Sequence, residues 1–450
     1  MTDRARAERT IVAQSTTAGR SALAVLRVSG PDACGVGQRV CEHWPHEPRR
    51  LGRSRFRDPT SGEILDDGLV AWFPSPSSYT GEDVVEIHTH GGLSAPAAVL
   101  GALIRAGAHA AAPGEFTQRA LWNGKVDLVR AEAIGDLIDA RTQAARRAAI
   151  HGVSGAMTAR FAELRDALIG LEGLLAFDLD FPEEDAGQIA RAEILAAATT
   201  VEERILAVIR TAPAATIAAH GALVVLAGVP NSGKSSLFNA LIGQERAITS
   251  AVPGTTRDAI EVLVDADPWP YRLVDTAGLR DAHDAIERAG IETATRYLAG
   301  ADVVIACDCA AGLASVVSSL GTQTGAVIIS VRTKADVPSP PSGSADFVVS
   351  ARTGDGLAAL REGLLRAIAS RTGGASGDDG LIMRERQRSA LELAAREVAA
   401  FREAWAAGAL PAPVAATHIR AAVLALDELI GTVTVDDVLA RVFASFCVGK

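Results

Sequence analysis

The chain has 450 residues, a net charge of −10 at pH 7 and 48% hydrophobic residues. This length predicts several domains, because one domain usually takes about 100 to 200 residues. The negative charge argues against a broad electropositive surface for nucleic acid, so any RNA contact is expected to be local or supplied by a partner.

The opening sequence MTDRARAERTIVAQ carries charges but has no apolar core and no small-residue cleavage site. We find no run of about 18 uncharged apolar residues, which a membrane span would need. We therefore expect a cytoplasmic protein with no membrane association. The five cysteines, at 34, 41, 307, 309 and 447, are too scattered for a disulfide framework and are expected to be reduced thiols.

Residues 1–118 mix short apolar runs with Gly and Pro turns, which predicts an α/β domain. Two of these runs are Ala22 to Val28 and Val84 to Ile87. His88 and His90 have a spacing that can hold zinc on a strand, but no third ligand lies nearby in the sequence, so structural histidines are favoured.

Residues 119–216 and 372–450 place Ala, Leu, Arg and Glu at helical spacing and predict two all-helical stretches. They flank an α/β module at 217–371, so this module is expected to be an insertion in one helical bundle. Motions of the inserted module are then expected to be transmitted to the bundle. The acidic run Asp178 to Asp185 is interpreted as a solvated loop between helices. Arginines follow the inserted module and fit either a solvated helix face or a local phosphate contact; they are Arg384, Arg386 and Arg388.

The segment Gly228 to Ser235, GVPNSGKS, has the pattern of a phosphate-binding loop. The apolar run Leu223 to Ala227 predicts a strand before it, and Ser236 to Leu241 predicts a helix after it. In such a loop the main-chain N–H groups and the helix start bind phosphates, Lys234 reaches the terminal phosphates, and Ser235 offers a hydroxyl to Mg²⁺. A nucleoside triphosphate is the expected ligand.

Four further motifs follow in the order that a Ras-like GTPase uses: GTTRD at 254–258, DTAG at 275–278, TKAD at 333–336 and SAR at 350–352. Predicted strands precede the second and third, so these motifs are expected at the carboxyl edge of a doubly wound sheet. Thr256 would join Ser235 on Mg²⁺, Asp275 would hold the metal through water, and the Gly278 N–H would sense the γ-phosphate. Asp336 can accept two hydrogen bonds from guanine. Thr333 stands where most such proteins have Asn, which leaves the affinity for guanine open.

Leu279 follows the DTAG motif, so the water-orienting glutamine of Ras-type enzymes has no counterpart there. The acidic candidates are Asp281, Asp284 and Glu287, among which residue chemistry does not choose. Asn231 places an amide oxygen near the bridging phosphate oxygens, where a monovalent cation could neutralise developing charge. Near the last residue, Cys447 is interpreted either as a reactive thiol or as a small buried side chain.

The stretches TIVAQ, LRVSG, YTGEDVVEIHTHGG, PGEFTQRALWNGKVDL, AEAIGDLIDA, GVPNSGKSSLFNAL, PGTTRD, DTAGLR and FCVGK together resemble the MnmE (also called TrmE) family of tRNA modification GTPases over the whole chain. The resemblance implies an N-terminal α/β domain that dimerises and binds folate, an all-α helical domain split in the sequence, and an inserted Ras-like G domain. It implies GTP hydrolysis and a flavoprotein partner, MnmG. It also implies that an aminomethyl or carboxymethylaminomethyl group is built on the wobble uridine of certain tRNAs from a 5-formyl or 5,10-methylene tetrahydrofolate.

The resemblance also assigns residues. Folate contacts would fall on Arg27, Glu86, Lys125 and Lys450, with Cys447 beside the folate. Potassium ligands would be Asn231, Ser250, Val252 and Thr255, while Glu287 would orient water and Arg280 would be an ancillary charge. The remaining nucleotide contacts are expected at Ser232, Gly233, Lys234, Ser235, Ser236, Thr256, Asp275, Gly278, Thr333, Lys334, Asp336, Ser350, Ala351 and Arg352.

Two other classes share such a G domain. One is a guanine-nucleotide-dependent assembly factor for ribosomes, in which no covalent change to RNA occurs. The other is a nucleotide-dependent scaffold, which would bind GTP without potassium-stimulated turnover.

Overall fold

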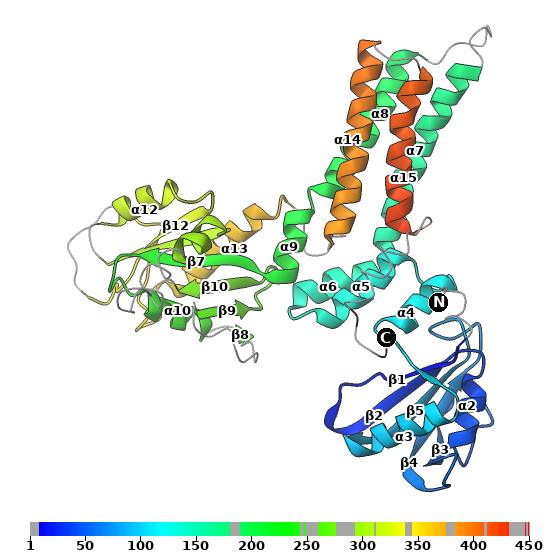
Figure 1. Cartoon of the computed structure of the whole chain (residues 1–450). Helices are drawn as coiled ribbons and strands as arrows, with labels where there is room; N and C mark the ends of the chain where they lie inside the picture. Colours follow the sequence, from blue (N-terminus) through cyan, green and yellow to red (C-terminus); the bar gives the residue numbers. More distant parts are fainter. Residues whose placement is uncertain are drawn as a thin grey trace. The chain divides into compact units, whose positions relative to one another are not determined.

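The computed structural model describes residues 9–180, 190–243, 247–248, 260–275, 293–309, 312–337, 344–374, 382, 384–408, 412–431, 446 and 449 (Figure 1). Contacts divide the chain into two compact units. The first is Met1–Gly135 with Asp427–Lys450, and the second is Asp136–Leu426. This division falls inside helix α5 (Leu128–Asp139).

In the described part of the first unit, six strands form a mixed sheet in the order β3-β4-β5-β2-β1-β6. Their bounds are β1 Ile11–Gln14, β2 Gly19–Ser29, β3 Gly52–Arg57, β4 Ile64–Phe73, β5 Val84–Gly92 and β6 His109–Ala110. Helices α2 (Ala33–Val40) and α3 (Ser94–Arg105) contribute to one core with the sheet. Leu26, Val28 and Ile87 point into that core, so alternate residues of β2 and β5 face away from it. The α/β expectation and both apolar strand runs are confirmed.

Helix α4 (Glu115–Trp122) carries a fully buried arginine. Arg119 pairs with Glu82 at 3.1 Å and with Glu115 at 3.0 Å, which makes burial of the charge tolerable. The end of the chain also belongs to this unit, because Phe446 packs against Leu128. In addition, Ser15 Oγ donates to the carbonyl of Gly449 at 3.1 Å.

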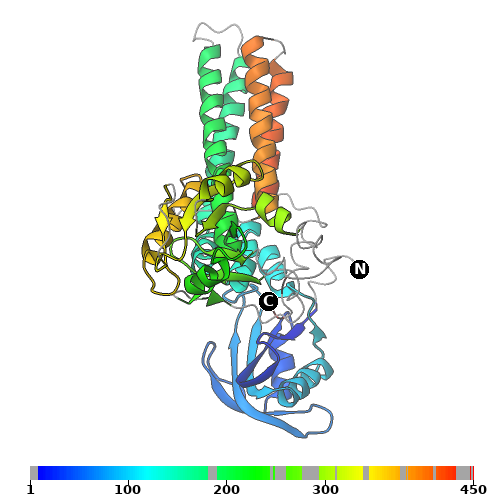
Figure 2. The same ribbon diagram turned by 90° about the vertical axis from the view of Figure 1, so that its left-hand side faces the viewer.

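The long helices of the second unit come from both sides of the inserted module: α7 (Ala156–Asp180) and α8 (Arg191–Ile209) before it, α14 (Glu385–Ala407) and α15 (Ala412–Ile430) after it. They run side by side in Figures 1 and 2, and α8 packs against both α7 and α14. Arg420 of α15 donates to Glu172 of α7 at 2.8 Å. The predicted single bundle is confirmed. Among the described residues, no helix combines the length and apolar character of a membrane span.

The predicted loop at Asp178 to Asp185 is wrong at its beginning, because α7 continues to Asp180. Leu174, Leu175 and Phe177 extend the helix-forming sequence pattern into this run, so the helix does not end at the first acidic residue.

The arginines after the inserted module have acidic neighbours in this unit. Arg384 pairs with Asp136 at 2.7 Å, and Arg388 pairs with Glu385 at 3.0 Å. These contacts favour the helix-face interpretation of both residues over a phosphate contact.

The inserted module is the predicted doubly wound sheet, with described strands in the order β13-β12-β11-β7-β10-β9-β8. Their bounds are β7 Ala222–Gly228, β8 Ala247–Ile248, β9 Ile260–Val264, β10 Tyr271–Asp275, β11 Val303–Asp308, β12 Val327–Arg332 and β13 Phe347–Val348. Strand β7 is central and parallel to β10 and β11. Its Val224 and Leu226 join a core with α10 (Lys234–Ile242) and α13 (Leu357–Arg371), while its Val225 joins the opposite core with α12 (Leu313–Gly321).

Helix α6 (Gln143–Val153) is inserted into the first of these cores. Its Ala144 and Ala148 belong to the same cluster as Ala218 of α9 (Ala212–His220) and Tyr271 of β10. Thr142 caps the helix, accepts from the N–H of Ala145 and donates to the carbonyl of Ala218 at 3.1 Å. The core of the inserted module thus continues into the helical part of the chain.

We expect Ala148→Leu to lower the free energy of unfolding by about 1–3 kcal/mol, because added methylene groups in a filled core displace their neighbours. Arg147→Ala is expected to cost at most about 1 kcal/mol. Its ion pair to Asp267 is 2.8 Å long, but the Asp267 side chain is 78% exposed and screened by water. Urea unfolding of the full chain measures both values, and an equal loss in the two variants would contradict an apolar origin of this contact.

Candidate functional site

The loop between β7 and α10 depends on backbone angles that few residues adopt. Gly228, Asn231 and Gly233 have φ of 148°, 58° and 88°. A Cβ on Gly228 would stand 2.0 Å from the carbonyl oxygen of Cys307, so glycine is required there. Asn tolerates the left-handed region better than most residues. Such turns direct successive N–H groups into one concavity, as anion binding requires.

Lys234 begins α10 and is 6% exposed. Its Nζ donates to the carbonyls of Gly228 at 3.1 Å and Val229 at 2.8 Å, so the ammonium lies over the loop. A phosphate in the loop would meet this ammonium together with the positive end of α10. Ser235 and Ser236 are exposed on the first helical turn, which leaves their hydroxyls accessible to a cation or a ligand.

Ser232 lies in the same loop and is fully buried. Its Oγ has no hydrogen-bond partner among the residues that the structure describes. An unsatisfied buried hydroxyl destabilises a fold by about 1–3 kcal/mol. The Ser232 hydroxyl therefore adds no stabilising hydrogen bond among these residues, while the main-chain N–H of Ser232 donates to the carbonyl of Val229 at 3.3 Å.

The neighbouring strands bring further groups to this edge of the sheet. Asp275 ends β10 beside Leu226 of β7 and is 3% exposed. Cys307 pairs with Gly228, and burial raises the pKa of its thiol to about 12. The carboxylate is thus placed where doubly wound sheets bind ligands, and the thiol on the other side of β7 stays protonated at neutral pH.

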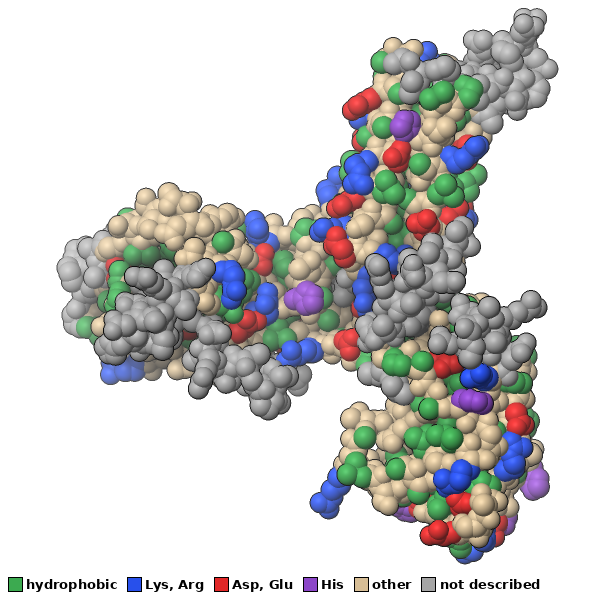
Figure 3. All heavy atoms as spheres, in the orientation of Figure 1, with side chains coloured by type: hydrophobic (Ala, Val, Ile, Leu, Met, Phe, Trp, Pro, Cys, Tyr) green, Lys and Arg blue, Asp and Glu red, His purple; other side chains and the backbone are tan. Residues whose placement is uncertain are grey.

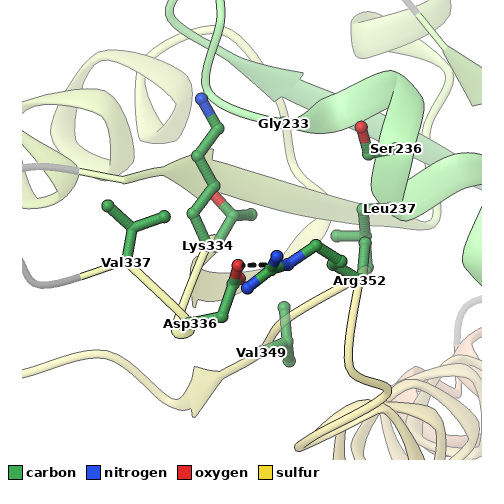
Figure 4. A pocket seen from close by; sticks show the side chains of 10 residues that line it. Gly233, Ser236, Leu237, Lys334, Asp336, Val337, Val349 and Arg352 are labelled. Atoms are coloured by element: carbon green, nitrogen blue, oxygen red, sulfur yellow. Dashed lines mark hydrogen bonds and ion pairs between the residues drawn. The ribbon is translucent and has the colours of Figure 1, made fainter.

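A cavity of about 220 Å³ opens beside the loop (Figure 4). It is far larger than the share of one water in the liquid, about 30 Å³. Its lining combines the end of the loop with the TKAD and SAR motifs and comprises Gly233, Ser236, Leu237, Thr333, Lys334, Asp336, Val337, Val349, Ala351 and Arg352. Apolar walls around one carboxylate suit a flat ring with polar edges.

Asp336 is the acidic group of this cavity. Its Oδ1 accepts from Ser350 Oγ at 2.7 Å, and its Oδ2 accepts from Arg352 Nε at 2.8 Å. The hydrogen bond from Ser350 holds the pKa of Asp336 below its ordinary value, and the Arg352 charge acts in the same direction. A carboxylate has about four acceptor positions, so two remain for the N1–H and N2–H donors of guanine.

The TKAD motif is also bound to the phosphate loop. Thr333 Oγ1 donates to the carbonyl of Ser232, and Lys334 Nζ donates to the carbonyl of Asn231 at 2.7 Å. Lys334 has a φ of 55°, which turns its side chain toward the loop. Thr333 and Lys334, which are consecutive in the TKAD motif, therefore hold two consecutive main-chain carbonyls of the phosphate loop.

The structure brings most of the described nucleotide residues together. The phosphate loop holds Asn231, Ser232, Gly233, Lys234, Ser235 and Ser236, and the cavity or its supporting bonds hold Thr333, Lys334, Asp336, Ser350, Ala351 and Arg352. Asp275 is on the adjacent strand. The predicted site residues that lie outside the described part of the chain are Ser250, Val252, Thr255, Thr256, Gly278, Arg280, Glu287, Cys447 and Lys450.

Sequence reasoning missed the apolar walls and one acid. Leu237, Val337 and Val349 line the cavity. Val337 directly follows the TKAD motif, Val349 directly precedes the SAR motif, and Leu237 lies two residues after the phosphate loop. Asp308 ends β11 and is 3% exposed, and its carbonyl accepts from the N–H of Thr333 at 2.9 Å. The sequence did contain a signal for Asp308, because it is an acidic residue at the carboxyl end of an apolar run that predicts a buried strand.

A second cluster lies on the face of the N-terminal sheet opposite to α2 and α3. Arg27 and Glu86 are cross-strand partners, and Arg27 Nη2 donates to Glu86 Oε1 at 2.7 Å. The guanidinium carbon of Arg27 is 5.7 Å from the ring centre of Tyr79 and 6.0 Å from that of Phe116. Glu86 is therefore a half-buried paired residue and not an exposed strand position.

The other groups near this cluster are only partly engaged. Glu86 Oε2 lies 3.9 Å from His88 Nε2, which is buried without a hydrogen-bond partner among the described residues. Lys125 Nζ donates to the carbonyl of Pro76 at 3.0 Å. His90 is paired separately, with its Nδ1 2.8 Å from Asp66 Oδ1.

Ser232→Ala is expected to raise the free energy of unfolding by about 1 kcal/mol, since it removes a buried hydroxyl that no described group satisfies. GTP affinity should stay within about twofold, because the loop uses the main chain of this residue. Ser235→Ala makes the same chemical change at an exposed position and should weaken Mg²⁺-dependent binding without raising stability. Thermal unfolding and nucleotide titration measure these effects, and a loss of stability in Ser232→Ala would show that the hydroxyl has a partner.

Comparison with known proteins agrees with this arrangement. The family model of the MnmE helical domain matches residues 128–447, and that of the GTP-binding protein TrmE N-terminus matches residues 10–125. The tRNA modification GTPase MnmE of Methylobacterium sp. (strain 4-46) is 44% identical over 450 residues, which cover 98% of this chain and 99% of that protein. The protein of the same name from Pectobacterium atrosepticum is 39% identical over 455 residues, with 98% and 99% covered.

Among solved structures, the G domain of the T. maritima FeoB iron transporter matches 32% of this chain and 96% of its own at 25% identity, with a TM-score of 0.24. The family models and the two full-length relatives agree over both units of the fold. The chain therefore belongs to the MnmE (TrmE) family of tRNA modification GTPases.

Proposed function

We propose that this protein is a potassium-activated GTP hydrolase that modifies tRNA. As a homodimer, and with the flavoprotein MnmG, it adds an aminomethyl or carboxymethylaminomethyl group to the 5 position of the wobble uridine of certain tRNAs. A folate supplies the one-carbon unit. The observation that carries the proposal is the joined phosphate loop and Asp336 cavity, in a chain of this family.

Guanine is the base that fits the charges of the cavity. Asp336 is ionised and has two acceptor positions left after Ser350 and Arg352 are bound. Guanine offers two adjacent donors to such a carboxylate, and adenine does not offer the same pattern. Thr333 in place of Asn leaves this contact intact, because it lies at the other end of the cavity, against the loop.

Hydrolysis would use cations on both sides of the phosphates. Ser235 and Thr256 would bind Mg²⁺, with Asp275 acting through water, and Asn231 would bind K⁺. Asn231 is exposed and its main chain is fixed by Lys334, which supports a defined position for its amide. Further K⁺ ligands would come from Ser250, Val252 and Thr255, and two G domains of the dimer would meet to close the site.

The folate donor would bind at the second cluster. The Arg27 cation suits a glutamate tail or a ring carbonyl, and Glu86 Oε2 accepts no hydrogen bond from the described residues. Pterin N–H groups are donors for such an oxygen, and the aromatic rings beside Arg27 suit a flat heterocycle. Phe446 and Gly449, the described neighbours of Cys447 and Lys450, lie in the same unit.

Binding of tRNA would be shared with the partner. The net charge is −10, and the face of the molecule in Figure 3 intersperses blue and red side chains over the long helices. Phosphate contacts need concentrated Lys and Arg. A flavoprotein that supplies the basic surface would reconcile this charge with an RNA substrate.

Mass spectrometry of tRNA nucleosides tests the proposal. Cells without the protein should lack the modified wobble uridine and should regain it when the wild-type chain is supplied. A chain with Lys234→Ala should fail to restore it, because it cannot hold the triphosphate. An unchanged nucleoside profile in the deletion would defeat the modification function and favour an assembly factor.

Glu287→Ala should reduce GTP turnover at least about 100-fold while GTP affinity stays within about twofold, since positioning of the attacking water acts in the transition state. Asp281→Ala and Asp284→Ala are the matched controls and should retain most turnover. Phosphate release in KCl against NaCl measures the effect. Turnover retained in Glu287→Ala, or lost in a control instead, would reject the assignment.

A further inference from the structure

We infer that the base cavity binds guanine through N1 and N2 at Asp336 and offers no side-chain donor to N7. The consequence is a nucleotide specificity that tolerates changes at position 7 of the purine. The residue that determines this is Thr333, and the inference rests on the proposed binding of guanine to Asp336.

The orientation of the base follows from the two ends of the cavity. In Figure 4, Asp336 and Gly233 of the phosphate loop lie on opposite sides of the lining. A guanine that meets Asp336 with N1 and N2 turns its five-membered ring, which carries the ribose and triphosphate, toward the loop. N7 belongs to that ring. Thr333 is the polar side chain there, since a Cβ on Gly233 would stand 3.4 Å from its Oγ1.

Thr333 has no proton left for N7. A threonine hydroxyl has one donor. That donor is directed to main-chain carbonyls, because Oγ1 bonds to the carbonyl of Ser232 and lies 3.4 Å from the carbonyl of Asp308. Both partners are acceptors, and Thr333 is 5% exposed, so the hydroxyl does not turn away from them without leaving a buried carbonyl unpaired.

The other polar side chains of the lining are directed elsewhere. Lys334 Nζ is bonded to the carbonyl of Asn231, and Figure 4 shows it turned away from Asp336. Arg352 reaches the opposite end of the cavity, where its Nε is bonded to Asp336. Ser236 belongs to the first turn of α10 and therefore lies on the phosphate side.

An Asn side chain at position 333 differs from Thr in the relevant property. Its amide has two N–H donors and one acceptor, so it can bond to a main-chain carbonyl and to a base nitrogen together. Thr333 makes the bond to the carbonyl of Ser232 in the loop, but it has no second donor for a base nitrogen.

The test compares GTP with 7-deaza-GTP, in which a C–H group replaces N7. Both displace a ribose-labelled fluorescent GDP from the full-length protein in Mg²⁺ and K⁺. The wild type should bind 7-deaza-GTP no more weakly than GTP. Thr333→Asn should prefer GTP by about two- to tenfold, the usual worth of one neutral hydrogen bond.

Thr333→Val separates the two roles of the hydroxyl. It should weaken both nucleotides by the same factor, because the carbonyl of Ser232 loses its donor, and the ratio of the two affinities should not change. Thr333→Ser keeps the hydroxyl and should match the wild type in both measurements. A wild type that binds 7-deaza-GTP more than about threefold more weakly than GTP would overturn the inference. A change of the ratio in Thr333→Val would overturn it as well.

Discussion

The two hydrogen bonds between the TKAD motif and the phosphate loop are the constraint on which the nucleotide site depends. Each peptide plane of the loop has a carbonyl on one side and an N–H group near the other, so fixing the carbonyls of Asn231 and Ser232 also fixes where the adjacent N–H groups point. A ligand that moved Thr333 or Lys334 would therefore also move the main-chain amides of the phosphate loop.

The sequence predicted the elements around this site where the pattern is local. A strand, a glycine-rich loop and a helix are contiguous, and the order of the motifs specified the parallel strands that bring Asp275 beside the loop. The hydrogen-bond partners of Asp336 were harder to predict from the sequence. Ser350 and Arg352 were recognised as a motif, but their bonds to both carboxylate oxygens depend on the packing of β12 and β13.

The hydrophobic and charge patterns of the sequence did not predict contacts between residues that are far apart in the chain and belong to no motif. The alanines of α6 look like any helical alanines, and only the fold shows that Ala144 and Ala148 enter the core of the inserted module. Likewise, Arg27 and Glu86 are paired by strand register across many residues of sequence, so composition and spacing did not join them. The resemblance to a family named both residues, and the structure shows that they form an ion pair across neighbouring strands. The end of α7 was missed because its acidic residues were weighed above its apolar ones.

Cys307 gives the site a chemical property of its own. Peroxide and similar oxidants attack thiolates, and burial keeps this sulfur in the neutral form beneath Gly228. A sulfenic acid there would add an oxygen to the floor of the loop and disturb the close approach that Gly228 makes to its neighbour. Burial thus keeps the thiol beneath this loop in the protonated form that oxidants attack least.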